Sequence, residues 1–241
     1  MSSRKNQRRA QQAVRAQLAA ERRRRRMIWT SVLAAVVVLV AGGVTGAIVL
    51  TQRDARDSAA YAVPDTATRD DPGLRLGQGP VRVDVYFDYM CPNCKEFESL
   101  ASSVLTSFVS TQKITLVYHP LDYLDSASAG TRYSTRSAAA AGCAADAGKL
   151  PDFTNALFGR QPKEKSSGLT NAQIVAAGKA AGITDASFAT CVTSQKYRDW
   201  VSHVSNQASG KGVQSTPSVF VNDKQVDPSA TALANAINAA A

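Results

Sequence analysis

Residues 27–50 form the most apolar stretch of the chain and contain no charged side chain. At about 1.5 Å per residue, a helix of this length would cross a hydrocarbon core of about 30 Å. Five arginines, Arg22–Arg26, precede the stretch, whereas the charges that follow it at 53–57 cancel. The positive-inside rule then predicts a cytoplasmic N-terminus, with the rest of the chain outside the cytoplasm. We therefore predict a single-pass protein of the cell membrane, in contact with membrane lipid.

The alternative for residues 27–50 is a cleaved signal peptide. The apolar region of a signal peptide is only about 7–15 residues long. The Ala-x-Ala sequence that could mark a cleavage site, at 60–62, lies well downstream of the apolar stretch. A retained signal anchor explains the pattern better.

Residues 51–78 have few large apolar side chains and several Asp, Gly and Pro residues, a composition typical of a linker. The domain organisation follows from these composition changes. We predict a basic cytoplasmic tail at 1–26, a transmembrane helix at 27–50, an extracytoplasmic linker at 51–78 and a folded domain at 79–241.

The hydrophobic pattern becomes alternating at 81–89, where every second residue from Val81 to Phe87 is Val or Phe, and this predicts a strand. From 91 to about 110 the apolar residues recur at helical spacing, and an apolar run at 114–118 predicts a second strand. Two strands joined by a helix form a βαβ unit with a parallel pair. The apolar stripe of the predicted helix contains Phe97, Leu100, Ala101, Val104, Leu105 and Phe108.

Near the C-terminus the pattern predicts a strand at 218–221, a returning strand at 225–226 and a final helix with Leu233 and Ile237 on its apolar side. Between the two halves, residues from about 121 to 214 are rich in Ala and have helical periodicity. The helices expected there lie near 132–149, 151–160, 170–181, 185–195 and 197–210. The sequence thus predicts an α/β domain with a large all-helical insertion.

The net charge of +9 comes from 28 Lys and Arg against 19 Asp and Glu. Residues 1–26 hold ten of the basic residues and one acidic residue, Glu21, which accounts for the whole net charge. The rest of the chain is balanced, with 18 basic and 18 acidic side chains. Such a domain lacks the excess of positive charge typical of nucleic-acid-binding proteins, so we expect no nucleic-acid partner.

Two cysteines are spaced as Cys91-Pro92-Asn93-Cys94 where the first strand meets the first helix. With Cys91 as the N-cap, Pro92 takes the first helical position, where its missing N–H costs nothing. The backbone amides of Asn93 and Cys94 would then point at the Cys91 sulfur and, with the helix dipole, favour a thiolate. Cys91 is thus the predicted nucleophile, and Cys94 is the predicted resolving thiol.

Two other uses of this cysteine pair have less support. A zinc site needs about four ligands, and neither His119 nor His203 is spaced as a partner of the pair, so we expect no metal. A purely structural disulfide across one helical turn would close a very short loop and stabilise the fold little.

The segment Phe87–Phe97, which contains the cysteine pair, and the segment Gly212–Asn222 resemble the DsbA-like family of thioredoxin-fold disulfide oxidoreductases. The resemblance covers about residues 79–241. It implies a thioredoxin fold, βαβ followed by ββα, with the helical insertion between the halves. It also implies that Pro217 is a cis-proline beside the redox pair and that Thr216 offers its backbone to an extended substrate.

The chain departs from the family pattern at two positions. Asn93 stands where DsbA-like oxidases often have His, so one electrostatic contribution to a stable thiolate is missing. Val85 stands where thioredoxin-fold enzymes commonly have a buried acid. Nearby Asp88 could relay the proton of the resolving thiol or serve only as a hydrogen-bonding group. Glu98, in the first turns of the helix, is expected on a solvated face.

Cys143 and Cys191 lie on predicted helices of the insertion. Four cysteines allow three pairings, and only Cys91 with Cys94 and Cys143 with Cys191 leaves the redox pair free to cycle. Disulfides persist outside the cytoplasm, so we expect a permanent structural disulfide between Cys143 and Cys191. The alternative is two buried, unpaired cysteines.

We predict that the chain introduces disulfides into reduced, unfolded proteins that are secreted or belong to the cell envelope. By resemblance, a quinone-linked membrane protein, of the DsbB type or similar to vitamin K epoxide reductase, would reoxidise the pair, and no organic cofactor is implied. A reductase or isomerase of the same fold is the first alternative. A redox-silent, membrane-tethered binding module is the second, and the intact cysteine pair argues against it.

Overall fold

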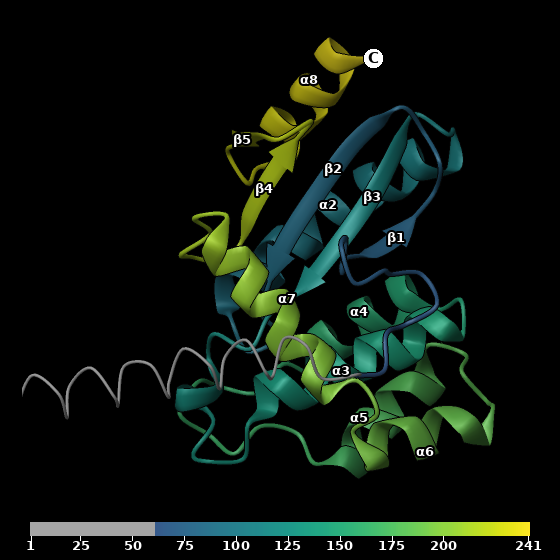
Figure 1. Cartoon of the computed structure of the whole chain (residues 1–241), viewed down its shortest axis with the longest axis vertical. Helices are drawn as coiled ribbons and strands as arrows, with labels where there is room; N and C mark the ends of the chain where they lie inside the picture. The colour runs from purple at the N-terminus through teal and green to yellow at the C-terminus, as the bar shows by residue number, and fades with distance from the viewer. Residues whose placement is uncertain (1–60) are drawn as a thin grey trace, which may run out of the picture. The chain divides into compact units, whose positions relative to one another are not determined.

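The computed structural model describes residues 61–241, which are coloured in Figure 1. The predicted cytoplasmic tail at 1–26 and the predicted transmembrane helix at 27–50 lie outside the described residues. Within 61–241, no helix is both long enough and apolar enough to cross a membrane.

Within the described residues, five strands form a mixed sheet in the order β1-β3-β2-β4-β5. They span Leu74–Leu76 (β1), Val81–Phe87 (β2), Ile114–Pro120 (β3), Ser218–Val221 (β4) and Lys224–Val226 (β5). The central strand β2 runs parallel to β3 and antiparallel to β4. Because β2 has a neighbour on each side and helices over both faces, six of its seven residues are buried.

Helices cover the two faces of the sheet. α2 (Pro92–Ser110) connects β2 to β3 and lies behind them in Figure 1, and α8 (Ala230–Ala240) packs against α2 and β4. α7 (Arg198–Gly210) crosses in front of the sheet and contacts β3. The predicted βαβ unit, with its parallel strands, is therefore confirmed.

The all-helical insertion lies between β3 and β4 in the sequence and at the lower end of the sheet in Figure 1. Before α7 it contains the short 3-10 helix η1 (Asp125–Ala127), α3 (Tyr133–Asp146), α4 (Leu150–Gly159), α5 (Asn171–Ala180) and α6 (Ala186–Ser194). α3 is buried along almost its whole length. Its many alanines permit this, because small side chains let the surrounding helices approach closely.

The folded domain begins earlier than the sequence predicts. β1 pairs antiparallel with β3, with Leu74 opposite Tyr118, and Leu74 is fully buried. Just upstream, the indole N–H of Trp200 donates to the carbonyl of Pro72 at 2.9 Å. The predicted linker at 51–78 is therefore wrong for residues 61–78, which belong to the folded domain. β1 has only three residues, which is too short for an alternating pattern to show in the sequence. Its pairing with β3 makes it a strand.

Glu98 and Leu100 on α2 have environments opposite to those expected. Glu98 is 5% exposed, whereas Leu100 is 60% exposed. The buried residues Cys94, Ala101 and Leu105 lie three or four positions from one another or from Glu98, so they share its face of the helix. The buried face of α2 therefore includes the side of Cys94. Burial raises the pKa of Glu98 to about 7.

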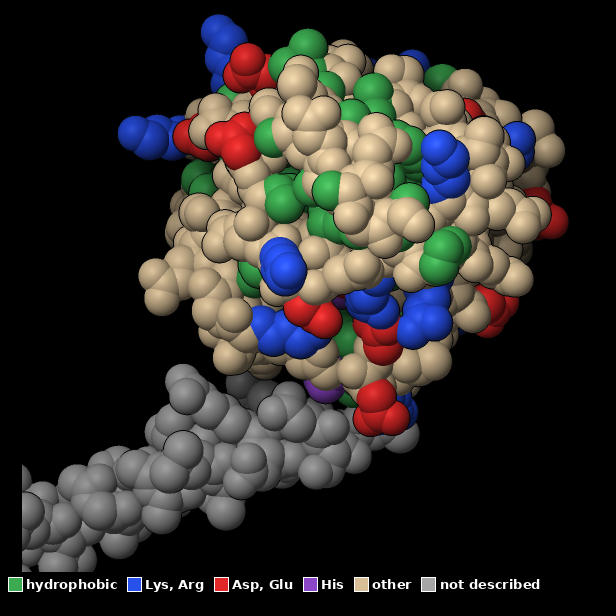
Figure 2. Space-filling model, turned by 90° about the horizontal axis from the view of Figure 1, so that it is seen from above, with side chains coloured by type: hydrophobic (Ala, Val, Ile, Leu, Met, Phe, Trp, Pro, Cys, Tyr) green, Lys and Arg blue, Asp and Glu red, His purple; other side chains and the backbone are tan. Residues whose placement is uncertain are grey.

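The face of the domain drawn in Figure 2 mixes basic and acidic side chains. Blue Lys and Arg side chains lie beside red Asp and Glu side chains, and no continuous basic surface covers this face. This mixture is what the balanced charge beyond the N-terminal tail leads one to expect.

Candidate active site

Cys91 lies at the junction between the central strand and the first helix of the domain. It is the N-cap of α2, with extended backbone angles (φ −75°, ψ 118°), and Pro92 follows in the first turn. The N–H of Cys91 donates to the carbonyl of Asp88 at 3.0 Å and closes the turn after β2. Both thiols of the pair are free; Cys91 is 7% exposed and Cys94 is 1% exposed. The structure therefore shows the pair in its reduced form.

Several hydrogen-bond donors converge on the Cys91 sulfur. The thiol of Cys94 makes the largest contribution, the side chain of Thr216 adds another, and the backbone amides of Cys94 and Asn93 add two more. Together they outweigh partial burial and lower the pKa of Cys91 to about 6. A thiol with this pKa is mainly a thiolate at neutral pH, which makes it both a nucleophile and a good leaving group. The side chain of Asn93 is exposed, so its backbone amide makes this contribution.

Cys94 has the opposite electrostatic environment. Burial raises the pKa of its thiol well above the usual range, and the neighbouring Cys91 sulfur raises it further. Cys94 therefore holds its proton under conditions in which Cys91 has lost one. Shifts in opposite directions assign different roles to two chemically identical groups.

The strand β4 brings Thr216 and Pro217 to the cysteine pair. β4 pairs antiparallel with β2, with Ser218 opposite Tyr86, so the residues just before β4 lie beside the end of β2. The Thr216–Pro217 peptide bond is cis. The thiol of Cys91 lies 3.5 Å from the carbonyl oxygen of Thr216 and donates to it. Pro217 has no N–H, so it presents no backbone donor beside the pair.

Asp88 is a buried acid three residues before Cys91. Its carboxylate accepts hydrogen bonds from the N–H of Met90 at 2.8 Å, the hydroxyl of Ser134 at 2.8 Å and the N–H of Leu124 at 2.9 Å. Burial nevertheless raises the pKa of Asp88 to about 7, and the charge on Cys91 adds to the rise. The bonds to Ser134 and Leu124 tie the end of β2 to the helical insertion.

The thioredoxin family model matches residues 76–239. The chain belongs to the thioredoxin family. Its sheet, its helix α2 after the central strand and its cis-proline before β4 form a thioredoxin-like α/β fold, with the helical insertion between β3 and β4.

Three solved thioredoxin-fold structures are similar over most of their length. Reduced DsbG, a disulfide bond oxidoreductase from Mycobacterium tuberculosis, is 30% identical, with a TM-score of 0.61, over 69% of this chain and 86% of its own. Oxidised DsbA of the same organism is 29% identical, with a TM-score of 0.60, over 69% and 91%. MdbA, a thiol-disulfide oxidoreductase from Actinomyces oris, is 25% identical, with a TM-score of 0.62, over 76% and 94%. With the geometry of the cysteine pair, these similarities support a protein thiol-disulfide oxidoreductase.

The chain also matches part of the serine/threonine-protein kinase PknE of Mycobacterium tuberculosis. The two sequences are 33% identical over 93 residues, which is 36% of this chain. The match spans 16% of the length of the kinase, so it carries no argument about the activity of this thioredoxin-family chain.

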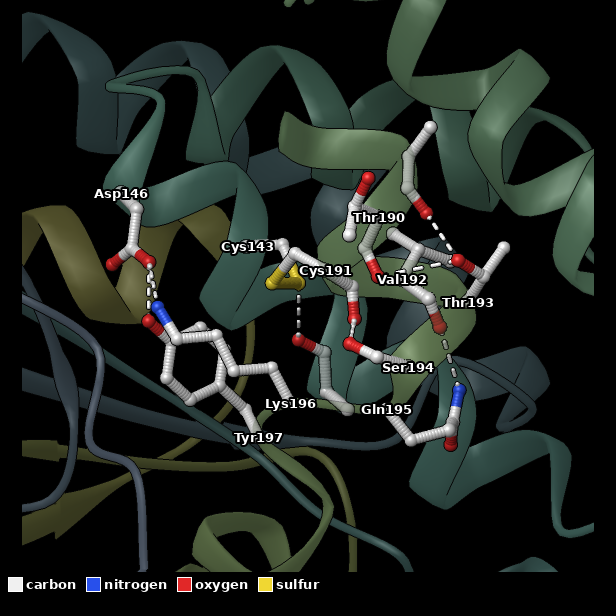
Figure 3. The surroundings of a disulfide bond; sticks show 12 residues. Cys143, Asp146, Thr190, Cys191, Val192, Thr193, Ser194, Gln195, Lys196 and Tyr197 are labelled. Atoms are coloured by element: carbon white, nitrogen blue, oxygen red, sulfur yellow. Dashed lines mark hydrogen bonds and ion pairs between the residues drawn. A yellow bond between two sulfur atoms is a disulfide. The ribbon is translucent and has the colours of Figure 1, made fainter. Parts of the chain in front are cut away.

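The second cysteine pair forms a disulfide within the helical insertion (Figure 3). Cys143 of α3 and Cys191 of α6 are joined with an S–S distance of 2.08 Å and a Cα–Cα distance of 6.0 Å. Next to it, the carboxylate of Asp146 accepts from the Tyr197 hydroxyl and lies 3.6 Å from the Lys196 ammonium group. The disulfide and the Asp146 contacts tie α3 to α6 and to the start of α7.

Gln161 is a residue of this site that the sequence analysis missed. Its side-chain Nε2 donates to the carbonyls of Tyr89 at 3.0 Å and Cys91 at 2.8 Å. A single glutamine 70 residues from the nearer partner leaves no spacing pattern, so only the fold reveals the contact.

Within 61–241, no group of three or more His, Cys, Asp or Glu side chains is placed to hold a metal ion. His119 is 2% exposed, and its Nε2 lies 2.7 Å from Asp84 Oδ1. The same carboxylate oxygen pairs with Arg82 at 2.6 Å. These contacts give His119 a structural role inside the sheet.

Proposed function

We propose that this oxidoreductase introduces disulfides into reduced, unfolded proteins that are secreted or belong to the cell envelope, using Cys91 and Cys94. The observation that carries the proposal is the convergence of the Cys94 thiol, the Thr216 side chain and two helix amides on the Cys91 sulfur. These donors stabilise the Cys91 thiolate, which is a product of disulfide donation. Stabilising the reduced enzyme makes the oxidised enzyme a stronger oxidant.

The reaction starts from the Cys91–Cys94 disulfide. A client thiolate attacks the Cys91 sulfur, the Cys91–Cys94 bond breaks, and Cys94 leaves and takes up a proton, in keeping with the raised pKa of its thiol. A second client thiolate then attacks the client sulfur of the mixed disulfide and releases Cys91 as a thiolate. The client loses two electrons and gains a disulfide, and the enzyme gains those two electrons.

The reduced enzyme must then be reoxidised. By family resemblance, a quinone-linked membrane protein would accept the two electrons, either of the DsbB type or similar to vitamin K epoxide reductase. A transmembrane helix at 27–50 would keep the domain in the plane of such a partner and outside the cytoplasm. The uncharged stretch and the Arg22–Arg26 run support this part of the proposal.

The same residues could run the chemistry in the direction of reduction or isomerisation, and Asn93, in place of the His of many DsbA-like oxidases, keeps that direction open. The reduction potential of the Cys91–Cys94 pair decides between the two. We would equilibrate the full chain, in detergent, in glutathione buffers and measure the reduced fraction by thiol alkylation. A value near −120 mV, about that of DsbA, would support the oxidase, and a value near −270 mV, about that of thioredoxin, would overturn it.

A Cys143→Ala/Cys191→Ala variant provides the control, because any thiol detected in it belongs to Cys91 or Cys94. A pair that neither oxidises nor reduces in these buffers would point to the redox-silent binding module.

A further inference from the structure

The helical insertion contacts the catalytic junction through the side chain of Gln161. This amide follows α4, and its Nε2 donates to the backbone carbonyl of Tyr89 and to that of Cys91. An amide nitrogen carries two hydrogens, so both can be used in these two bonds. The two carbonyls flank Met90, in the short turn between β2 and α2. The insertion thus holds the backbone that carries the nucleophile.

The docking of α4 explains why Gln161 reaches this turn. Thr154 and Phe158 are four residues apart on one face of α4, and Gln161 follows directly after the C-cap residue Arg160. All three contact Tyr89. The Thr154 hydroxyl lies 2.9 Å from the Tyr89 hydroxyl, the Phe158 and Tyr89 rings are 5.0 Å apart, and Gln161 binds the Tyr89 carbonyl. α4 and the residue that follows its C-cap are therefore docked on Tyr89.

The Cys91 carbonyl has a second function, because it is the N-cap carbonyl of α2. It accepts from the N–H of Cys94 at 3.2 Å and from the N–H of Lys95 at 3.3 Å. Gln161 adds a third donor, at 2.8 Å, and this is the shortest of the three bonds. A carbonyl held by donors from α2 and from the insertion cannot rotate freely. The amides of Asn93 and Cys94, which donate to the Cys91 sulfur, follow this carbonyl in the first turn of α2.

We propose that Gln161 is a positioning residue for the redox reaction: by holding the Cys91 carbonyl, it keeps the donors of the first turn of α2 aimed at the Cys91 thiolate. Gln161 does not touch the reacting sulfur. Its effect passes through the peptide group of Cys91, so the helical insertion helps to activate the cysteine. This inference rests on the proposed function, in which Cys91 is the nucleophile.

Two variants of Gln161 and one control test the proposal. Gln161→Met keeps a side chain of similar length and removes both donors. Gln161→Glu keeps the shape but replaces the donors with a carboxylate that faces carbonyl groups. Thr154→Val removes the hydroxyl bond to Tyr89 on the same docking face and leaves the Cys91 carbonyl bonds intact. All are made in the full chain, held in detergent, with the Cys143–Cys191 disulfide intact.

The primary measurement is the pKa of Cys91, from thiolate absorbance at 240 nm against pH, together with the rate of alkylation at pH 6. We expect Gln161→Met to raise the pKa by about half a unit to one unit, which at pH 6 lowers the thiolate fraction about two- to fivefold. Gln161→Glu should raise it further, because a like charge disfavours the thiolate. Thr154→Val should lower the midpoint of denaturant unfolding and leave the pKa of Cys91 unchanged.

The outcomes separate the two proposals. If wild-type Cys91 titrates at the ordinary value of a free cysteine, the proposed function fails, and the role of Gln161 fails with it. If the wild-type pKa is low and Gln161→Met leaves it unchanged, only the role of Gln161 is overturned. Equal pKa shifts in Gln161→Met and Thr154→Val would also overturn it, because the effect would then belong to the packing of α4 and not to the carbonyl bond.

Discussion

The thiol of Cys91 donates to the carbonyl oxygen of Thr216 at 3.5 Å, although 125 residues separate the two in sequence. The contact follows from the antiparallel pairing of β2 with β4, which places the cis peptide beside the N-terminus of α2. The Cys91 sulfur therefore has donors from its own helix on one side and the backbone carbonyl of Thr216, just before β4, on the other.

Substituting one cysteine of the redox pair at a time should separate their roles. Cys91→Ser removes the nucleophile and should abolish disulfide exchange with reduced client peptides. In Cys94→Ser, the Cys91 thiolate can attack the disulfide of an oxidised client peptide and release one client thiolate, but no Cys94 thiol is left to displace the client, so the mixed disulfide should accumulate. Non-reducing electrophoresis and mass spectrometry would detect it. Accumulation of the complex on Cys94 in the Cys91→Ser variant would contradict the assignment.

Alkylation of Cys91 should depend on pH in a way that an ordinary cysteine does not. Because the pKa of Cys91 is lowered to about 6, the thiolate fraction rises through pH 6 and is nearly complete above about pH 7. The alkylation rate should therefore reach a plateau by about pH 7.5. A rate that keeps rising to pH 9 would show that the donors around the sulfur do not stabilise the thiolate.

Asp88 and Cys91 should titrate as a coupled pair. The charge on Cys91 raises the pKa of Asp88, and a repulsion between two charges acts on both groups. Asp88→Asn removes this repulsion and should lower the pKa of Cys91 by about half a unit. Thiolate absorbance at 240 nm against pH measures this shift. Asp125→Asn is the control, because the Asp125 carboxylate also accepts a hydrogen bond from α3. A higher pKa in Asp88→Asn would mean that the bonds to Met90 and Ser134 matter more than the charge.

Glu98 should destabilise the folded domain at neutral pH. Burial raises its pKa to about 7, its Oε1 has no hydrogen-bond partner, and its Oε2 accepts one long bond, 3.4 Å, from Tyr118. A carboxyl whose pKa is higher in the folded state binds more protons there, so stability falls as pH rises from about 4.5 to 7.

Glu98→Gln should therefore raise the free energy of unfolding by about 2 kcal/mol at pH 8 and change it little at pH 4. Urea unfolding at the two pH values tests this, with Glu96→Gln on the exposed side of α2 as the control. Equal effects of Glu98→Gln at both pH values would contradict the titration argument.

The Cys143–Cys191 disulfide should stabilise the domain without taking part in catalysis. It closes a loop of 48 residues, which in the chain-entropy model is worth about 4 kcal/mol. Cys143→Ala/Cys191→Ala should lower the free energy of unfolding by an amount of that order. The pH profile of Cys91 alkylation should not change, and a changed profile would show that the two cysteine pairs are coupled.

Local sequence patterns predicted much of this protein. The alternation of apolar residues identified β2, and their helical spacing identified α2. Both patterns can be read from residues only a few positions apart. The N-cap position of Cys91 and the first-turn position of Pro92 follow from the same local rules, and the structure has both. The helices of the insertion were placed within three residues of their observed ends. Family resemblance, and not spacing, supplied Thr216 and Pro217.

The tertiary structure decided what depends on distant contacts. β1 is a strand only because β3 offers it an edge, and Gln161 reaches the Cys91 carbonyl only because α4 docks on Tyr89. Glu98 is buried because the face of α2 that includes Cys94 is turned inward, and a periodic pattern defines such a face only to within about one residue. Sequence alone thus determined most of the helices and strands and the reactive pair, whereas packing determined which groups surround the sulfur and set its chemistry.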